Sequence, residues 1–131
     1  MIILKAYITH VAVYTADLER MKEFYVKYFC GAANQKYQNN SGFSSYFLTF
    51  ENDVRLEIMS HEQLEFKEAI EKVNGISHIA FSVGSKENVL ELTNLLVSDG
   101  YQLLSPPRKT GDGYFESCIS DPDGNRIEIT E

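Results

Sequence analysis

Four side chains in this sequence are candidate metal ligands, by their type and by their place in a repeat. They are two histidines and two glutamates, His10, Glu57, His78 and Glu128. Imidazole and carboxylate groups together suit a divalent ion such as Ni, Co, Zn, Mn or Fe(II). An ion with open positions can chelate the oxygens of a small substrate and act on it as a Lewis acid. The four residues therefore indicate a metal centre, with the identity of the metal left open.

The four residues recur in a repeated pattern. Residues 8–13, ITHVAV, and residues 76–81, ISHIAF, are similar at every position, and His is third in both. Residues 54–59, VRLEIM, and residues 125–130, NRIEIT, share an alternation of Arg, an apolar residue, Glu and Ile. Each half of the chain therefore carries one His near its beginning and one Glu near its end.

The elements that must position these residues have the same order in both halves. In the first half a strand is followed by a helix capped by Asp17 and ended by Gly31, and then by three strands. The strands are predicted at residues 6–14, 33–39, 43–50 and 53–59. In the second half, a strand precedes a helix between Ser85 and Gly100, and three strands follow. These strands are predicted at residues 76–83, 101–105, 114–120 and 125–130.

This order predicts an α+β fold of two βαβββ modules. We expect one domain over residues 1–131. Module one covers about 1–60 and module two about 75–131, and residues 61–74 form a connector, either a short surface helix or an ordered segment. Residues 105–113 are predicted to be a loop, which is either a mobile lid or a plain solvent loop.

The order of the strands also predicts how His and Glu meet. A right-handed crossover and two hairpins make the first and fourth strands of a module parallel, so that they can be neighbours. The alternation of side chains then places His10 and Glu57 on the face that the helix does not cover, and His78 and Glu128 likewise. A single His in a strand is more often a core residue, and a single Glu more often part of a surface ion pair. Their recurrence in equivalent places favours a metal site.

Composition excludes several classes of partner. The chain has 131 residues, with 12 Lys and Arg against 19 Asp and Glu, which gives a formal net charge of −7. Such a charge repels nucleic acid and acidic lipid, and no apolar run is long enough to span a bilayer. The start lacks the features of a signal peptide, and Cys30 and Cys118 form no CxxC motif. We therefore expect a cytoplasmic protein with reduced thiols and a small-molecule substrate, and neither a nucleic-acid nor a membrane partner.

Three segments together resemble a known superfamily. They are ITHVAVYTADLERMKEFYVKYFCGA, GISHIAFSV and DPDGNRIEI, at residues 8–32, 75–83 and 121–129. In this order and spacing they are similar to the vicinal oxygen chelate superfamily, which includes glyoxalase I, fosfomycin and bleomycin resistance proteins and extradiol dioxygenases. The resemblance implies that paired modules curl into an open barrel around a metal. It also implies that the ligands are His10, Glu57, His78 and Glu128, the four-ligand set of the glyoxalase I type.

The resemblance further implies a function and an assembly. The expected activity is that of a metal-dependent lyase resembling glyoxalase I, or of an isomerase, which chelates a small oxygenated metabolite and stabilises an enediolate-type intermediate. Glu128 is the expected base, with Glu57 second. The alternatives are an Fe(II) extradiol-type dioxygenase and a non-catalytic protein that binds a drug or metabolite. A homodimer is expected, whose sites lie either within one chain or between two.

Two positions depart from the glyoxalase I pattern. This sequence has Tyr14 and His61 where bacterial members of that type carry an Arg and an Asn that help to hold glutathione. Glutathione is therefore not the expected substrate. Arg55 and Arg126 share the faces of the two glutamates, where each could bind an anionic substrate or form a structural ion pair.

Overall fold

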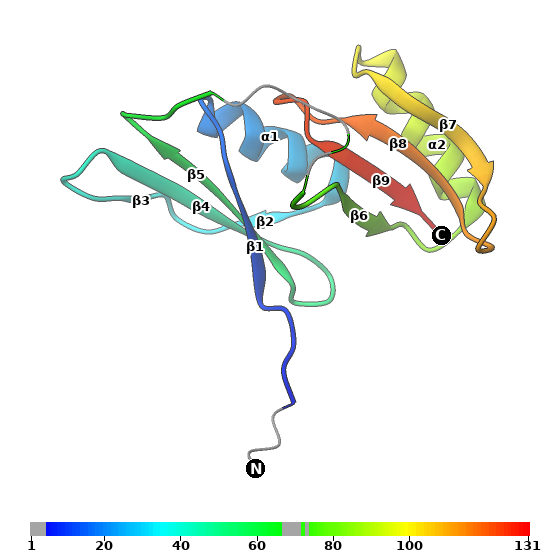
Figure 1. Ribbon diagram of the computed structural model, residues 1–131, viewed down its shortest axis with the longest axis horizontal. Helices are drawn as coiled ribbons and strands as arrows, with labels where there is room; N and C mark the ends of the chain where they lie inside the picture. Colours follow the sequence, from blue (N-terminus) through cyan, green and yellow to red (C-terminus); the bar gives the residue numbers. More distant parts are fainter. Residues whose placement is uncertain (1–4, 67–71, 73) are drawn as a thin grey trace. The chain divides into compact units, whose positions relative to one another are not determined.

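The computed structural model describes residues 5–66, 72 and 74–131, and the chain divides into two compact units. The first unit is Met1–Glu65 and the second is Phe66–Glu131. In each unit one helix lies against one face of a mixed sheet (Figure 1). The predicted α+β class and its doubled order of elements are confirmed.

The first unit is a five-stranded sheet with helix α1. Its elements are β1 (His10–Tyr14), α1 (Leu18–Phe29), β2 (Ala32–Ala33), β3 (Tyr37–Gln38), β4 (Phe43–Thr49) and β5 (Arg55–His61). The strand order is β1-β5-β4-β2, with β3 also paired to β4, and β1 runs parallel to β5. The first and last strands of the unit are therefore neighbours, as the crossover argument predicts.

The second unit repeats this plan with a four-stranded sheet. Its elements are β6 (Ile79–Ser82), α2 (Lys86–Ser98), β7 (Leu103–Lys109), β8 (Phe115–Ser120) and β9 (Arg126–Thr130). The strand order is β6-β9-β8-β7, and β6 runs parallel to β9. The first and last strands are again adjacent.

Helix α1 covers only one face of its sheet. Asp17 caps the helix, because its Oδ1 accepts the Arg20 N–H at 3.0 Å. Cys30, not Gly31, takes the left-handed conformation that ends it, at φ 55°. The apolar face of the helix packs on the buried side chains of β4 and β5, namely Leu48, Leu56 and Ile58. Since side chains alternate along a strand, the other face of β5 carries the residues at odd positions, Arg55 to His61.

Helix α2 covers one face of the second sheet in the same way. Ser85 is its cap, with Oγ accepting the Asn88 N–H at 3.2 Å. Its buried Thr93 makes a hydrogen bond of 2.7 Å to Ser117 on β8. Ile127 and Ile129 of β9 are fully buried, and α2 packs on this strand. The opposite face of β9 carries Glu128.

The strand predicted at residues 33–39 is broken into β2 and β3. Asn34 follows β2, and its side chain intervenes in the pairing with β4. Its Oδ1 accepts the Phe47 N–H at 2.8 Å, while its own N–H donates to the Phe47 carbonyl at 3.0 Å. A side-chain acceptor thus replaces a backbone one, and regular pairing stops there.

The predicted loop at 105–113 is wrong over residues 105–109, which continue β7. This strand includes Pro106 and Pro107 and lies at the edge of its sheet, where prolines are tolerated. Its register against β8 shifts twice over this stretch. Only a short turn then separates β7 from β8, and the Thr110 N–H closes it by donating to the Tyr114 carbonyl at 2.7 Å.

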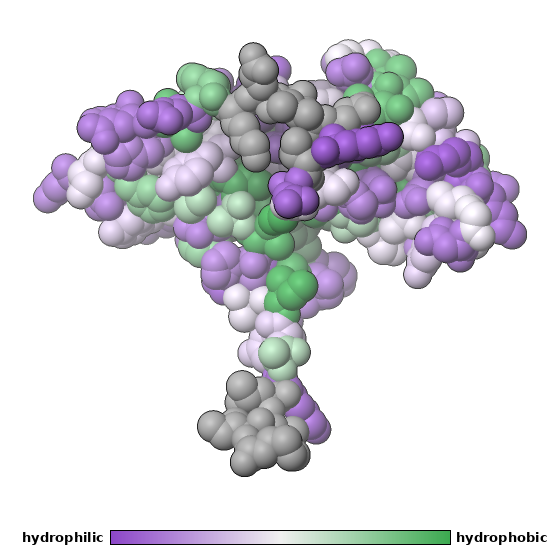
Figure 2. Space-filling view, in the orientation of Figure 1, coloured by the Kyte–Doolittle hydropathy of each residue, from purple (hydrophilic) through white to green (hydrophobic). Residues whose placement is uncertain are grey.

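The first strand begins later than predicted, at His10. Apolar side chains in the segment before it lie at the surface (Figure 2). Among them Tyr7 and Ile8 are 83% and 70% exposed.

The connector predicted at 61–74 falls partly outside the described residues. Its described part contains the last residue of β5, a turn and no helix. None of the helices in the described part of the chain is long and apolar enough to cross a membrane.

Candidate metal centre

The first unit brings His10 and Glu57 together. His10 is the first residue of β1, and Glu57 lies in the middle of β5 on the face away from α1. His10 Nε2 lies 4.0 Å from Glu57 Oε1, and the two side chains are 39% and 15% exposed. Both groups are therefore near enough to share an ion and open enough to admit one.

The second unit brings His78 and Glu128 together in the equivalent way. His78 directly precedes β6, and Glu128 lies in the middle of β9. His78 Nε2 lies 3.1 Å from Glu128 Oε2, and the side chains are 39% and 25% exposed. The pairing of one His with one Glu in each module follows the sequence prediction.

A hydroxyl group holds the far nitrogen of each imidazole. Thr9 Oγ1 lies 3.0 Å from His10 Nδ1, and Ser77 Oγ lies 3.0 Å from His78 Nδ1. A hydroxyl can accept or donate, so it partners Nδ1 in either neutral tautomer of the ring. When Nδ1 carries the proton, Nε2 presents a lone pair on the side of the glutamate, as a metal ligand requires. The sequence signal for this contact is a Ser or Thr directly before each His.

Phe47 and Arg55 also lie beside the first His–Glu pair. The Phe47 ring lies edge-on to the His10 ring, with centroids 5.3 Å apart at 79°. Phe47 is opposite Glu57 in the β4–β5 ladder. The Arg55 guanidinium lies over the same ring, 4.8 Å from its centroid. The turn between β4 and β5 fixes this register, so the alternation of β4 could have identified Phe47.

The second pair has different neighbours, Cys118 and Glu116 on β8. Cys118 is buried opposite Glu128, and burial raises the pKa of its thiol. A thiol that keeps its proton is a poor metal ligand. Burial also raises the pKa of Glu116, and the Glu128 carboxylate raises it further by its charge and a hydrogen bond. No pattern in the sequence singles out Glu116, although the DPDG turn sets its register against β9.

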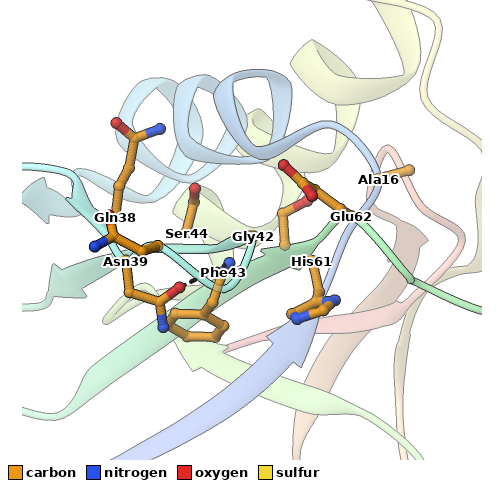
Figure 3. Close-up of a pocket in the computed structure, with 10 residues that line it drawn as sticks. Ala16, Gln38, Asn39, Gly42, Phe43, Ser44, His61 and Glu62 are labelled. Carbon is orange, nitrogen blue, oxygen red and sulfur yellow. Dashed lines mark hydrogen bonds between the residues drawn. The ribbon is translucent and has the colours of Figure 1, made fainter.

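The third histidine of the chain, His61, is engaged elsewhere. It lines a polar cavity of about 580 Å³ at the ends of β4 and β5, together with Ala16 and residues 38–40, 42–44 and 60–62. Figure 3 shows Glu62 on the side of α1 and His61 on the opposite side. His61 Nδ1 accepts the Gln63 N–H at 3.0 Å. A neutral His61 therefore carries its proton on Nε2 and is a hydrogen-bond donor rather than a metal ligand.

Each unit by itself brings together one His and one Glu of the predicted ligand set. Within the described residues, no group of three or more His, Cys, Asp or Glu side chains is placed to hold an ion. A single His–Glu pair is too few ligands for a firmly held divalent ion. The predicted set of four therefore needs both halves of the repeat, from one chain or from two.

The hydroxyl on His78 should contribute to metal affinity. Ser77→Ala removes the partner of Nδ1, so the imidazole loses a contact that orients it. We expect about a 10-fold loss of Zn²⁺ affinity, at the low end of the effect of outer-shell partners. Ser77→Thr keeps the hydroxyl and should retain the affinity. Titration of the metal-free protein with Zn²⁺ measures both, and equal affinity in wild type and Ser77→Ala would contradict this role.

Comparison with known proteins identifies the family of this chain. The family model described as Glyoxalase/Bleomycin resistance protein/Dioxygenase superfamily matches residues 7–129. An uncharacterized protein of Bacillus subtilis (strain 168), YqjT, is 26% identical over 124 residues, which cover 92% of this chain and 94% of that protein.

Solved structures share the fold. A glyoxylase/bleomycin resistance protein/dioxygenase domain from Frankia sp. EAN1pec has a TM-score of 0.83 at 16% identity, covering 97% of this chain and 92% of that one. The glyoxalase family protein from Enterococcus faecalis has a TM-score of 0.77 at 24% identity, with coverage of 95% and 97%. Glyoxalase I from Zea mays has a TM-score of 0.77 at 21% identity, covering 94% of this chain and 43% of that one. On the family match, this chain belongs to the Glyoxalase/Bleomycin resistance protein/Dioxygenase superfamily.

Proposed function

We propose that this protein is a metal-dependent lyase or isomerase of the glyoxalase-like kind, acting on a small oxygenated metabolite. The observation that carries the proposal is the matched pair of half-sites. In each, one imidazole Nε2 lies within 4.0 Å of a carboxylate oxygen, in the same place of the repeated module. Family membership supports the proposal, because the superfamily includes glyoxalase I enzymes.

The side chains fit a divalent cation. His10, Glu57, His78 and Glu128 would hold it, with two nitrogen and two oxygen donors. The hydroxyls of Thr9 and Ser77 support this assignment, because they leave both Nε2 atoms for the cation. When bound, the cation supplies a Lewis acid that polarises the oxygens of the substrate and lowers the energy of negative charge on them.

We assign proton transfer to Glu128. Its carboxylate would take the proton from the hydroxyl-bearing carbon next to a carbonyl and return it to the carbonyl carbon, while the hydroxyl proton passes to the former carbonyl oxygen, which makes the net reaction an isomerisation. The partly open side chain of Glu128 and its contact with His78 at 3.1 Å support this role. Glu57 is the second choice, because its side chain is less exposed.

We propose a substrate other than glutathione adducts. His61, a donor through Nε2, stands where the glyoxalase I pattern has a glutathione-binding Asn. We also propose a cytoplasmic location, which the two free cysteines support.

Metal removal tests the proposal. We expect the purified protein to hold about one divalent ion per chain, whether a site forms within one chain or between two. A chelator should abolish conversion of α-hydroxycarbonyl substrates, and re-added metal should restore it. Conversion that survives complete metal removal would contradict the proposal. Consumption of O₂ during turnover would indicate a dioxygenase instead.

A further inference from the structure

We propose that Arg55 is a specificity residue that binds the carboxylate of an anionic substrate at the first His–Glu pair. This inference rests on the proposed function, because it places the substrate's oxygens beside His10 and Glu57. It goes further by naming a chemical class, the 2-hydroxy and 2-oxo carboxylates.

Arg55 stands beside both members of the pair. It lies directly opposite His10 in the parallel β1–β5 ladder, and neighbouring strands are only about 4.8 Å apart. It precedes Glu57 by two residues on β5, so both side chains leave the same face of the sheet. The ring contact of Phe47 with His10 and the stacking of Arg55 on Phe47 place all four side chains on that face.

The Arg55 guanidinium is held in place and has no charged partner. Its carbon lies 4.8 Å from the centroid of the Phe47 ring, over the face of the ring. A guanidinium has five N–H donors, and a cation–π contact with one ring leaves donors available for a ligand. Within the described residues, its side chain makes no ion pair or hydrogen bond, so the alternative of a structural ion pair is not realised.

The second unit differs from the first in the residues around its glutamate. The corresponding residue of the second unit, Arg126, has interaction partners of its own, and its charge acts on the Cys118 thiol. Cys118 also occupies the place opposite Glu128 that Phe47 occupies opposite Glu57. An arginine over the ring opposite the glutamate is thus found in the first unit, where the second unit has Cys118 in place of that ring.

The positive charge of Arg55 would offset the repulsion of an anionic substrate by the rest of the protein. The chain has a formal net charge of −7, and Glu57 adds a carboxylate at the site, so an approaching anion is repelled. A local cation can overcome this repulsion at short range. An arginine also matches a carboxylate in shape, because two parallel N–H groups donate to its two oxygens.

A pair of small probes tests the proposal. Glycolate and glycolamide offer the same two adjacent oxygens, but only glycolate is charged. We expect Arg55→Met to weaken glycolate binding about 10-fold or more and to weaken glycolamide binding much less, because a hydrogen bond to a charged group is stronger than one to a neutral carbonyl. Arg55→Lys keeps the charge without the planar fork and should recover only part of the loss. Calorimetric titration of Zn²⁺-loaded protein measures each affinity.

Arg20→Met is the matched control. It removes the same charge from an exposed residue on α1, which covers the opposite face of the sheet. Unchanged glycolate affinity in Arg55→Met, an equal loss in Arg20→Met, or no glycolate binding by wild type would overturn the inference. Zn²⁺ titration without a probe separates the two proposals. Loss of a nearby positive charge removes a repulsion, so Arg55→Met should not lower Zn²⁺ affinity. A wild type that binds Zn²⁺ but shows no effect of Arg55→Met on glycolate overturns this inference alone, whereas a wild type that binds no metal overturns the proposed function and this inference with it.

Discussion

Glu128→Gln should lower kcat for an α-hydroxycarbonyl substrate by about 100- to 10,000-fold, the usual contribution of a general base. The amide has nearly the same shape as the carboxylate but cannot take a proton. It can still face His78, whose Nε2 lies 3.1 Å from the carboxylate in the native protein. Steady-state kinetics at saturating metal measures the effect, so that weaker metal binding does not mimic a loss of chemistry.

Glu57→Gln is the informative comparison for this variant. It removes a carboxylate from the equivalent place in the first unit, opposite Phe47. If Glu128 is the base and Glu57 only a ligand, Glu57→Gln should weaken metal binding and keep most of the turnover at saturating metal. Full activity in Glu128→Gln under these conditions would remove Glu128 from its role. A reversed result would make Glu57 the base.

His10→Ala and His78→Ala should each reduce metal affinity by roughly 100-fold or more, because loss of an outer-shell partner alone costs about 10- to 100-fold. Each substitution leaves its glutamate without the imidazole that faces it, at 4.0 Å for Glu57 and 3.1 Å for Glu128. Metal analysis of the two purified variants measures the loss. A variant that keeps a full complement of metal would exclude its histidine from the ligand set.

Mixing the two variants tests where the complete site forms. We propose a homodimer, and a site shared between chains would combine His10 and Glu57 of one protomer with His78 and Glu128 of the other. A mixed dimer would then contain one intact site and one doubly altered site. Random reassortment after refolding together should restore about a quarter of the wild-type activity. A site within one chain predicts no recovery, because every chain in the mixture lacks one histidine.

The sequence was a sufficient guide to the secondary structure and to the two His–Glu pairs. Apolar spacing and capping residues predicted both helices, and the alternation along β5 and β9 predicted which face carries each glutamate. Local patterns suffice here because the handedness of the crossover leaves few topologies for each module. Besides the late start of β1 at His10, the exceptions are the break at Asn34 and the extension of β7 through Pro106 and Pro107. Both depend on hydrogen bonds and register shifts against another strand.

By itself, the sequence determined the repeat, the order of elements and the residue types that each half presents, because these follow from periodicity within one segment. Only the tertiary structure decided that Arg55 stacks on Phe47 instead of forming an ion pair, and that His61 turns its Nδ1 to the Gln63 N–H. The reason is that such contacts depend on side-chain rotamers and on the exact register between strands. Both are set by packing between segments distant in the chain, which no local pattern encodes.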